Sequence, residues 1–378
     1  MNSQVTETSI KDELMATSGS TLGENSFHTI LNDFVNRDVL VRQDRGEVSP
    51  KVPLFRNWLT DRGVSELLPN IRESDYLMRA LHDEETSRVN DREILDICDK
   101  LGRYKGKDFQ ATHVRAWLEQ FGSGTNQRLM YKLLSAMSVY DESTVRAKMK
   151  EALQIVTSGL RTKISPRQRV RRDIVVSYLE SSQSKSGPSY CRLFRDQNKM
   201  STDSFVTLEQ IRRRLIAWKR GNEQTPTADF QRLVLLDDFA GSGSSLVEGL
   251  EVAAETLKLV EQTGVGIVLI VVAGFDAAYN RIGACIDEFG IDVTVHFCDQ
   301  FSDEHKAFAP DAGIFLDETE RNEARNVAES FGLKLEKKHP LGYGGTEALV
   351  AFYESCPNNT LPILWSNNNK WRPLFPRH

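Results

Sequence analysis

Arg232-Leu-Val-Leu-Leu-Asp237-Asp238-Phe-Ala-Gly241-Ser242-Gly243-Ser244-Ser245 is the stretch of sequence that decides the fold. Its apolar run ends in two adjacent carboxylates, and a loop of Gly and Ser follows before a helix that opens at Ser245. Near-continuous apolar strands are typical of parallel sheets that helices cover on both faces. Open sheets of this kind bind ligands at the carboxyl ends of their strands. The stretch therefore predicts a strand, a loop and a helix, with a binding site at the loop.

The loop carries residue types that suit a phosphate group. Gly241 and Gly243 let the backbone approach an anion closely, and loop N–H groups beside a helix N-terminus favour negative charge. Asp237 and Asp238 are acceptors for ribose hydroxyls, or for Mg²⁺ through water. The alternative is a Gly-rich turn in which Asp237 only caps the helix. The complete strand, loop and helix context favours the phosphate site.

Strands and helices alternate along the chain from about residue 166. The expected strands are apolar and often β-branched: Ile174–Leu179, Leu233–Leu236, Ile267–Ala273, Val293–Phe297 and Ala348–Tyr353. The expected helices have apolar residues at helical spacing: Ser189–Lys199, Leu208–Lys219, Ser245–Glu261, Asp276–Phe289 and Glu320–Phe331. This alternation predicts an α/β fold with a parallel sheet flanked by helices.

The central stretch resembles the phosphoribosyl pyrophosphate motif of phosphoribosyltransferases, in which four apolar residues precede Asp-Asp and a Ser/Thr-Gly-x-Ser/Thr loop. The resemblance implies that Asp237 and Asp238 face the ribose hydroxyls, with Mg²⁺ as cofactor. It also implies that one loop holds the 5′-phosphate, namely Ala240, Gly241, Ser242, Gly243, Ser244 and Ser245. In that fold the loop after the first sheet strand contacts pyrophosphate, which assigns this role to Ser184, Lys185, Ser186 and Gly187. Lys185 suits it as a point charge, and the resemblance makes Lys185 catalytic together with the Asp pair.

The chain departs from this family at Gly241. Many members carry an acidic residue there, which in some serves as the general base on the accepting nucleobase. Glycine cannot perform acid–base chemistry, so the sequence leaves two functions open. One is an enzyme or toxin-like effector that makes or breaks an N-glycosidic or pyrophosphate bond. The other is a non-catalytic module that senses a nucleotide and contacts a partner or nucleic acid. A nucleotide biosynthesis enzyme is disfavoured by the additional N-terminal half.

The C-terminal segment adds a second resemblance. It contains Pro340-Leu-Gly-Tyr-Gly-Gly345 and several aromatic residues, among them Trp365, Trp371 and Phe375. With the two loops, it resembles the phosphoribosyltransferase-like effectors of bacterial conflict and antiphage defence systems, including some retrons, over residues 92–378. This implies a protein partner such as a reverse transcriptase. The three aromatic residues are predicted to anchor the tail rather than to stack on a base.

The remaining chain divides into three expected segments before the phosphoribosyltransferase-like domain of residues 166–378. Residues 1–25 are polar and expected to be poorly ordered, and residues 71–165 read as a helical connector or cap. Residues 26–70 form a winged-helix-like segment, with a hairpin of Val39–Val41 and Val48–Val52, or else a small structural cap. Basic and acidic residues interleave at the hairpin, so at most a weak nucleic-acid contact is expected there, beside a role in docking a partner protein.

The composition of the chain indicates where in the cell the protein is expected and which partners are excluded. The formal net charge of −5 gives no global attraction to nucleic acid. The five cysteines form no CxxC pair, which favours free thiols in a reducing cytoplasm over a zinc site. Met1–Asn25 carries no apolar signal segment, and the longest apolar run, Val265–Gly274, is too short to span a bilayer. We therefore expect a cytoplasmic protein without membrane contact, whose His296 and His305 are structural or solvent-facing rather than metal ligands.

Overall fold

The computed structural model describes residues 35, 40–43, 47–51, 89–158, 173–181, 186–221 and 230–377. The chain divides into two compact units, Met1–Glu85 and Thr86–His378. In the first unit, strands β1 (Leu40–Gln43) and β2 (Glu47–Pro50) pair antiparallel, as the predicted hairpin requires. The rest of the winged-helix-like segment and the predicted poorly ordered stretch, residues 1–25, lie outside the described residues.

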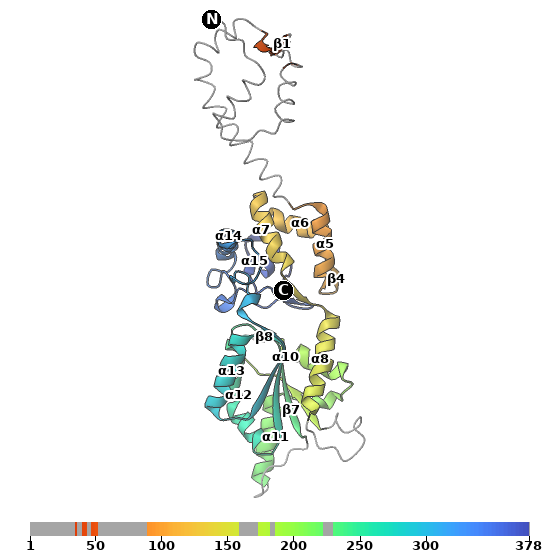
Figure 1. The fold of residues 1–378 in the computed structure, drawn as a ribbon. Coiled ribbons are helices and arrows are strands. Elements are labelled where there is room, and N and C mark those ends of the chain that lie inside the picture. The colour runs from red at the N-terminus through yellow and green to blue at the C-terminus, as the bar shows by residue number, and fades with distance from the viewer. Residues whose placement is uncertain are drawn as a thin grey trace. The chain divides into compact units, whose positions relative to one another are not determined.

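A four-stranded parallel sheet forms the centre of the second unit, in the order β6-β7-β8-β9 (Figure 1). The strands are β6 (Ile174–Ser177), β7 (Arg232–Ala240), β8 (Gly266–Phe275) and β9 (Val293–Phe301). β7 and β8 are almost entirely buried, because helices cover both faces of the sheet. The predicted α/β class with a parallel, helix-flanked sheet is therefore confirmed.

Two hydrophobic cores lie on the two faces of this sheet. On one face pack α11 (Leu208–Gly221), α12 (Ser244–Glu261) and α13 (Asp276–Phe289). On the other face pack α8 (Glu142–Thr157) and α10 (Gly187–Gln197). Figure 1 shows α12 and α13 on the opposite side of the strands from α8.

The chain order places a switch point between β6 and β7. After β6 and α10, a short 3-10 turn, η2 (Thr202–Ser204), leads to Phe205, which forms a parallel bridge with Val176 of β6. Val176 also pairs with Val234 of β7, so Phe205 lies on the other edge of β6. The chain therefore runs from β6 to the outer edge of the sheet at Phe205. It then crosses back to form β7 on the other edge of β6. Ligands of open α/β sheets bind at the carboxyl ends of such neighbouring strands.

The last predicted strand exists but does not belong to this sheet. β10 (Val350–Phe352) pairs in parallel with β5 (Ser138–Tyr140) in a separate two-stranded sheet. The expectation that Ala348–Tyr353 extends the main sheet is therefore wrong. All three residues of β10 are buried, and a strand buried on both faces carries no periodicity that identifies its neighbours.

A third core joins the first helices of the unit to its C-terminal segment. Its helices are α5 (Asp91–Leu101), α6 (Ala111–Glu119), α7 (Gly124–Ser135), α14 (Glu318–Leu335) and α15 (Pro362–Trp365). Short elements complete it: β3 (Arg103–Tyr104), β4 (Lys107–Asp108), η3 (Asp303–His305), η4 (Tyr343–Gly345) and η5 (Asn368–Lys370). We call this helical part of the second unit the cap.

The C-terminal aromatic residues anchor the tail within the cap, as predicted. The indole N–H of Trp365 donates to the carbonyl of Thr360 at 2.7 Å, and that of Trp371 donates to the carbonyl of Ile363 at 2.8 Å. Phe375 is fully buried. Trp365 and Trp371 are half-buried, so they hold the tail by their indole hydrogen bonds, and Phe375 holds it by burial.

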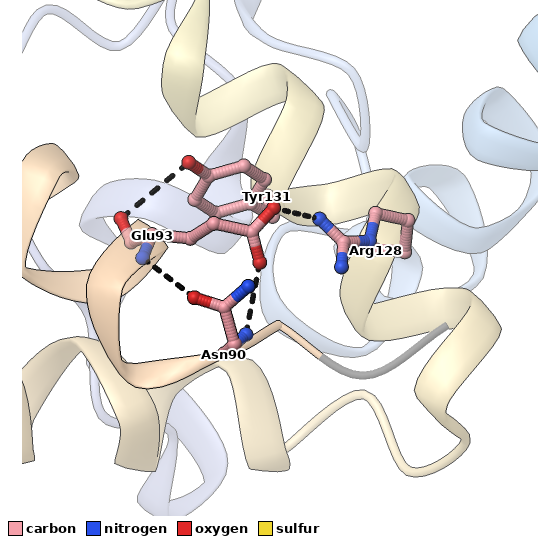
Figure 2. A network of polar contacts seen from close by, with 4 residues as sticks. All are labelled: Asn90, Glu93, Arg128 and Tyr131. Atoms are coloured by element: carbon pink, nitrogen blue, oxygen red, sulfur yellow. Dashed lines mark hydrogen bonds and ion pairs between the residues drawn. The ribbon is translucent and has the colours of Figure 1, made fainter. Parts of the chain in front are cut away.

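A polar network fixes the start of α5 against α7 (Figure 2). The Asn90 side chain accepts the Glu93 N–H, and the Glu93 carboxylate accepts the Asn90 N–H, each at 2.9 Å. Arg128 of α7 forms an ion pair with Glu93, and Tyr131 contributes its hydroxyl to the Glu93 carbonyl. Burial raises the pKa of Glu93, but the bonds from Arg128 and Asn90 outweigh it and hold this pKa below its usual value.

We predict that Glu93→Gln destabilises the protein by up to about 1 kcal/mol at neutral pH, because the ion pair with Arg128 loses its negative charge. The cap itself survives, since glutamine keeps an oxygen that can accept the Asn90 N–H. Because the pKa of Glu93 is lowered on folding, its contribution is present above the unfolded carboxyl pKa. That contribution is lost as the pH falls through the lower folded value. Urea unfolding of wild type and variant should therefore differ at pH 7 and converge in acid. Glu119→Gln, an exposed carboxylate on α6, is the control. A difference that does not depend on pH would contradict this assignment.

Candidate functional site

The candidate site lies at the switch point, where the loops after β6 and β7 meet. β7 ends at Ala240, and α12 begins at Ser244, one residue earlier than predicted. Gly243 caps α12 in the left-handed conformation, with φ +75°, which is accessible to glycine at little energetic expense. The strand, loop and helix predicted from the sequence are thus all present.

The Asp pair is joined to the loop after β6 by Ser186. The Ser186 hydroxyl lies 2.9 Å from Oδ1 of Asp237 and 2.8 Å from Oδ1 of Asp238. The two carboxyl groups also accept backbone N–H groups, from Asp238 and Phe239 respectively, each at 2.9 Å. A hydroxyl has one proton and cannot donate fully to both carboxyl groups. The sequence assigned Ser186 to pyrophosphate, whereas the structure places its hydroxyl on the Asp pair.

The two carboxyl groups differ in environment. Asp237 is only 5% exposed, and Asp238 is half-buried. Burial raises the pKa of Asp237 well above its usual value, and the negative charge of Asp238 raises it further. Asp237 therefore favours the protonated form, in which its O–H can donate to a neighbouring oxygen. Asp238 is the carboxyl group of the pair that solvent reaches.

The loop itself leaves backbone donors for a ligand. Neither Ser242 nor Gly243 donates its N–H to another group within the part of the chain that the structure describes. The Ser242 hydroxyl lies 3.0 Å from that of Ser244. A Cβ at Gly243 would lie 3.2 Å from the carbonyl oxygen of Ala278, so α13 packs closely behind the loop. The arrangement is that of an anion cradle at a helix N-terminus.

Asn359 of the cap covers Gly241. A Cβ at Gly241 would lie 2.2 Å from Cγ of Asn359. The Asn359 amide is held by two bonds, to the carbonyl of Tyr343 at 3.0 Å and to the hydroxyl of Thr346 at 3.1 Å. With Asn359 in this place, an acidic side chain has no room at position 241. The side chain of Asn359 is therefore a steric reason for glycine at position 241. The sequence alone did not reveal it.

Arg281 of α13 also reaches the loop. Its Nη1 donates to the Ser244 hydroxyl at 2.9 Å and lies 3.4 Å from the carbonyl oxygen of Ser242. Sequence reasoning missed both Arg281 and Asn359. Neither is part of a local motif, and each meets the loop only because distant segments fold together.

Tyr190 of α10 is a further buried group near the Asp pair. Its hydroxyl has no hydrogen-bond partner among the described residues. Burial raises the pKa of Tyr190 well above its usual value, and the negative charge of Asp238 adds to the shift. The ring packs edge-on against Phe352 at a centroid distance of 6.3 Å.

We predict that Tyr190→Phe stabilises the protein by about 1 kcal/mol, because it removes a buried hydroxyl that lacks a partner. Thermal unfolding of the full chain measures the change. Tyr140→Phe is the matched control, since it deletes a hydroxyl that donates to Asp299 at 2.9 Å and should be destabilising. A loss of stability in Tyr190→Phe would show that its hydroxyl is satisfied in solution.

The other predicted site residues are distributed as follows. Ser184 and Lys185 lie outside the described residues, so their pyrophosphate role stays a prediction. Gly187 begins α10, and a Cβ there would lie 2.6 Å from the side chain of Tyr178. Ala240 and Ser245 flank the loop at the end of β7 and in the first turn of α12.

His296 and His305 both lie in the part of the chain that the structure describes. No cluster of three or more His, Cys, Asp or Glu that could hold a metal ion occurs among the described residues. Asp299 of β9 pairs instead with Lys148 at 2.6 Å. His305 lies 3.1 Å from the Ser302 hydroxyl and stacks on Phe301. Within the Asp pair, Asp237 is buried and Asp238 is half-buried. The Asp238 carboxylate therefore fits a Mg²⁺ ion whose other ligands are water and substrate oxygens.

Within the described residues, no helix has the length and apolar character to cross a membrane. No curated protein matches the chain. One solved structure, "Structure of AQ2163 protein from Aquifex aeolicus", is similar at 10% sequence identity and a TM-score of 0.26, covering 52% of this chain and 87% of that one. The family model PRTase-CE matches residues 114–377, well over half of the sequence and the whole of the site described above. The chain therefore belongs to the PRTase-CE family, a phosphoribosyltransferase-like family.

Proposed function

We propose that this protein binds a phosphoribosyl compound or nucleotide at the switch point between β6 and β7. The phosphate would occupy the cradle of Gly241–Ser245, and the ribose hydroxyls would face Asp237 and Asp238. The observation that carries the proposal is the meeting of the two loops at the Asp pair through Ser186, in a member of this family. A loop that only joined a strand to a helix would have no need of two carboxylates and free N–H donors.

The Asp pair has the chemistry to act on the sugar. An ionised Asp238 would accept a ribose hydroxyl and would stabilise positive charge that develops at the anomeric carbon. A protonated Asp237 would donate to a second oxygen. Mg²⁺, when bound, would neutralise the phosphate charge, held by Asp238 through water and by the substrate's own oxygens. Lys185 would add positive charge at the pyrophosphate.

The absence of a basic side chain at position 241 limits which reactions the site can catalyse. Asn359 fills that space with a neutral amide, which cannot take a proton from an accepting nucleobase. The proposed activity is therefore hydrolysis at the anomeric carbon of the ribose rather than transfer to a base. Water would form the new C–O bond and give up a proton, and the nucleobase or pyrophosphate would leave with the electron pair of the broken bond. The site would act on a host nucleotide or on phosphoribosyl pyrophosphate, as an effector of a retron-type antiphage defence system.

A second candidate is a non-catalytic nucleotide sensor. Asn359 favours it, because the residue that touches the phosphate loop belongs to the cap and is bonded to Tyr343 and Thr346. A nucleotide phosphate bound in the loop would then change the contacts of Asn359 with the rest of the cap. In either case the first unit, Met1–Glu85, would dock a protein partner such as a reverse transcriptase or another defence component. Its contact with nucleic acid would be weak at most.

Calorimetric titration of the full chain with phosphoribosyl pyrophosphate and Mg²⁺ tests the proposal, with the ligand then recovered and separated by chromatography. Binding followed by release of pyrophosphate or a free base supports an enzyme. Binding with intact ligand supports the sensor. If neither phosphoribosyl pyrophosphate nor a panel of nucleoside monophosphates binds, the proposed function is wrong.

A further inference from the structure

Arg281 of α13 contacts the phosphate loop from the side on which α13 packs. It extends from α13, which follows β8, the strand next to β7. One nitrogen of its guanidinium, Nη1, contacts two loop residues, at 2.9 Å from the hydroxyl of Ser244 and 3.4 Å from the carbonyl of Ser242. These two residues flank Gly243, so the contact fixes the loop on both sides of its most permissive residue.

The bond to Ser242 determines where a backbone donor points. The carbonyl of Ser242 and the N–H of Gly243 belong to one planar trans peptide, in which the two groups point in opposite directions. When Arg281 attracts the carbonyl toward α13, the Gly243 N–H turns away from α13. It remains unbonded within the described part of the chain and is therefore directed toward the side where an anion would lie.

No carboxylate of the described residues pairs with Arg281. Among the described residues Arg281 forms no ion pair, whereas other exposed helical arginines do, such as Arg213 with Glu209 at 2.8 Å and Arg212 with Glu255 at 3.1 Å. An arginine keeps its positive charge at any physiological pH. The positive charge of Arg281 thus lies directly against the loop, where it adds to the field of the α12 N-terminus.

We propose that Arg281 is a positioning residue of the phosphate loop, and that it makes the loop selective for a phosphomonoester dianion over an unphosphorylated sugar. This rests on the proposed function, since it concerns the same site. Arg281 acts in two ways: it orients the Gly243 N–H through the Ser242 carbonyl, and it supplies a positive charge in contact with the loop. Arg281 itself need not touch the ligand.

Titration of the full chain with ribose 5-phosphate at several salt concentrations tests this role. Arg281→Gln should weaken binding about tenfold, which corresponds to about 1.4 kcal/mol, and should flatten the dependence of Kd on salt. Arg281→Lys keeps the charge on a side chain that is one bond shorter, which weakens the contacts with Ser242 and Ser244. Its salt dependence should therefore match the wild type, while its affinity falls less than that of Arg281→Gln. Arg213→Gln, which removes the same charge from α11, should leave the Kd unchanged.

The outcomes separate this inference from the proposed function. If the wild type binds ribose 5-phosphate and Arg281→Gln binds it equally well, the role of Arg281 is wrong and the proposed function stands. If the wild type does not bind any phosphoribosyl compound, both are wrong. Should Arg281→Gln fail to fold, Arg281→Lys decides, because wild-type affinity in that variant contradicts the positioning role.

Discussion

Asp238→Asn is expected to abolish binding of a phosphoribosyl compound while the melting temperature stays nearly unchanged. Asparagine retains an oxygen that can accept the Ser186 hydroxyl and the Phe239 N–H, now at 2.8 Å and 2.9 Å from Asp238. The local structure therefore survives. What is lost is the negative charge of a half-buried group, and with it the acceptor strength toward ribose hydroxyls and Mg²⁺.

Asp237→Asn is the matched comparison, and its effect on binding should be smaller. Burial and the charge of Asp238 raise the pKa of Asp237, so its uncharged form is favoured more than in a free carboxyl group, and an amide resembles that form. Calorimetric titration with ribose 5-phosphate and thermal unfolding should be measured on both variants. Equal losses of affinity and of stability in Asp238→Asn would instead mean that the pair is a structural capping network.

The parts of the fold that were predicted correctly are those whose signals are local. The apolar run of β7, the glycines of the loop and the opening of α12 all lie within Arg232–Ser245, and each signal acts through its near neighbours in sequence. β10 shows the limit of this reasoning. Its apolar residues predict a buried strand but not its partner, because pairing with β5 depends on how the cap folds.

The candidate site likewise contains residues that the sequence identifies and residues that only the structure identifies. Asp237, Asp238 and the loop serines are identifiable because their spacing is that of a known motif. Arg281 and Asn359 meet the loop from α13 and from the cap, and no periodicity marks them. Ser186 is intermediate: its position after β6 was informative, but its bonds to the Asp pair depend on the adjacency of β6 and β7.

Gly241 and Asn359 should behave as a coupled pair. A methyl group at Gly241 would lie 2.2 Å from Cγ of Asn359, 2.4 Å from its Nδ2 and 2.6 Å from its Oδ1. Gly241 does not adopt a positive φ, so the obstacle to alanine is steric rather than conformational. Overpacking of this kind destabilises by about 1–3 kcal/mol, and Gly241→Ala should also weaken ligand binding because the phosphate loop must shift.

Asn359→Ala removes the three clashing atoms together with the bonds to Tyr343 and Thr346. Alone it should destabilise by about 1–2 kcal/mol, since two hydrogen bonds of the amide are lost. The Tyr343 carbonyl keeps a donor in the Thr346 hydroxyl, at 2.7 Å. In the double variant the clash is absent, so the loss of stability should be clearly smaller than the sum of the two single losses. Gly283→Ala on α13, where a Cβ meets nothing within 4 Å, is the control and should stabilise by a few tenths to 1 kcal/mol. Additive losses in the double variant would mean that Asn359 does not cover Gly241 in solution, and the steric reason for glycine at this position would then be wrong.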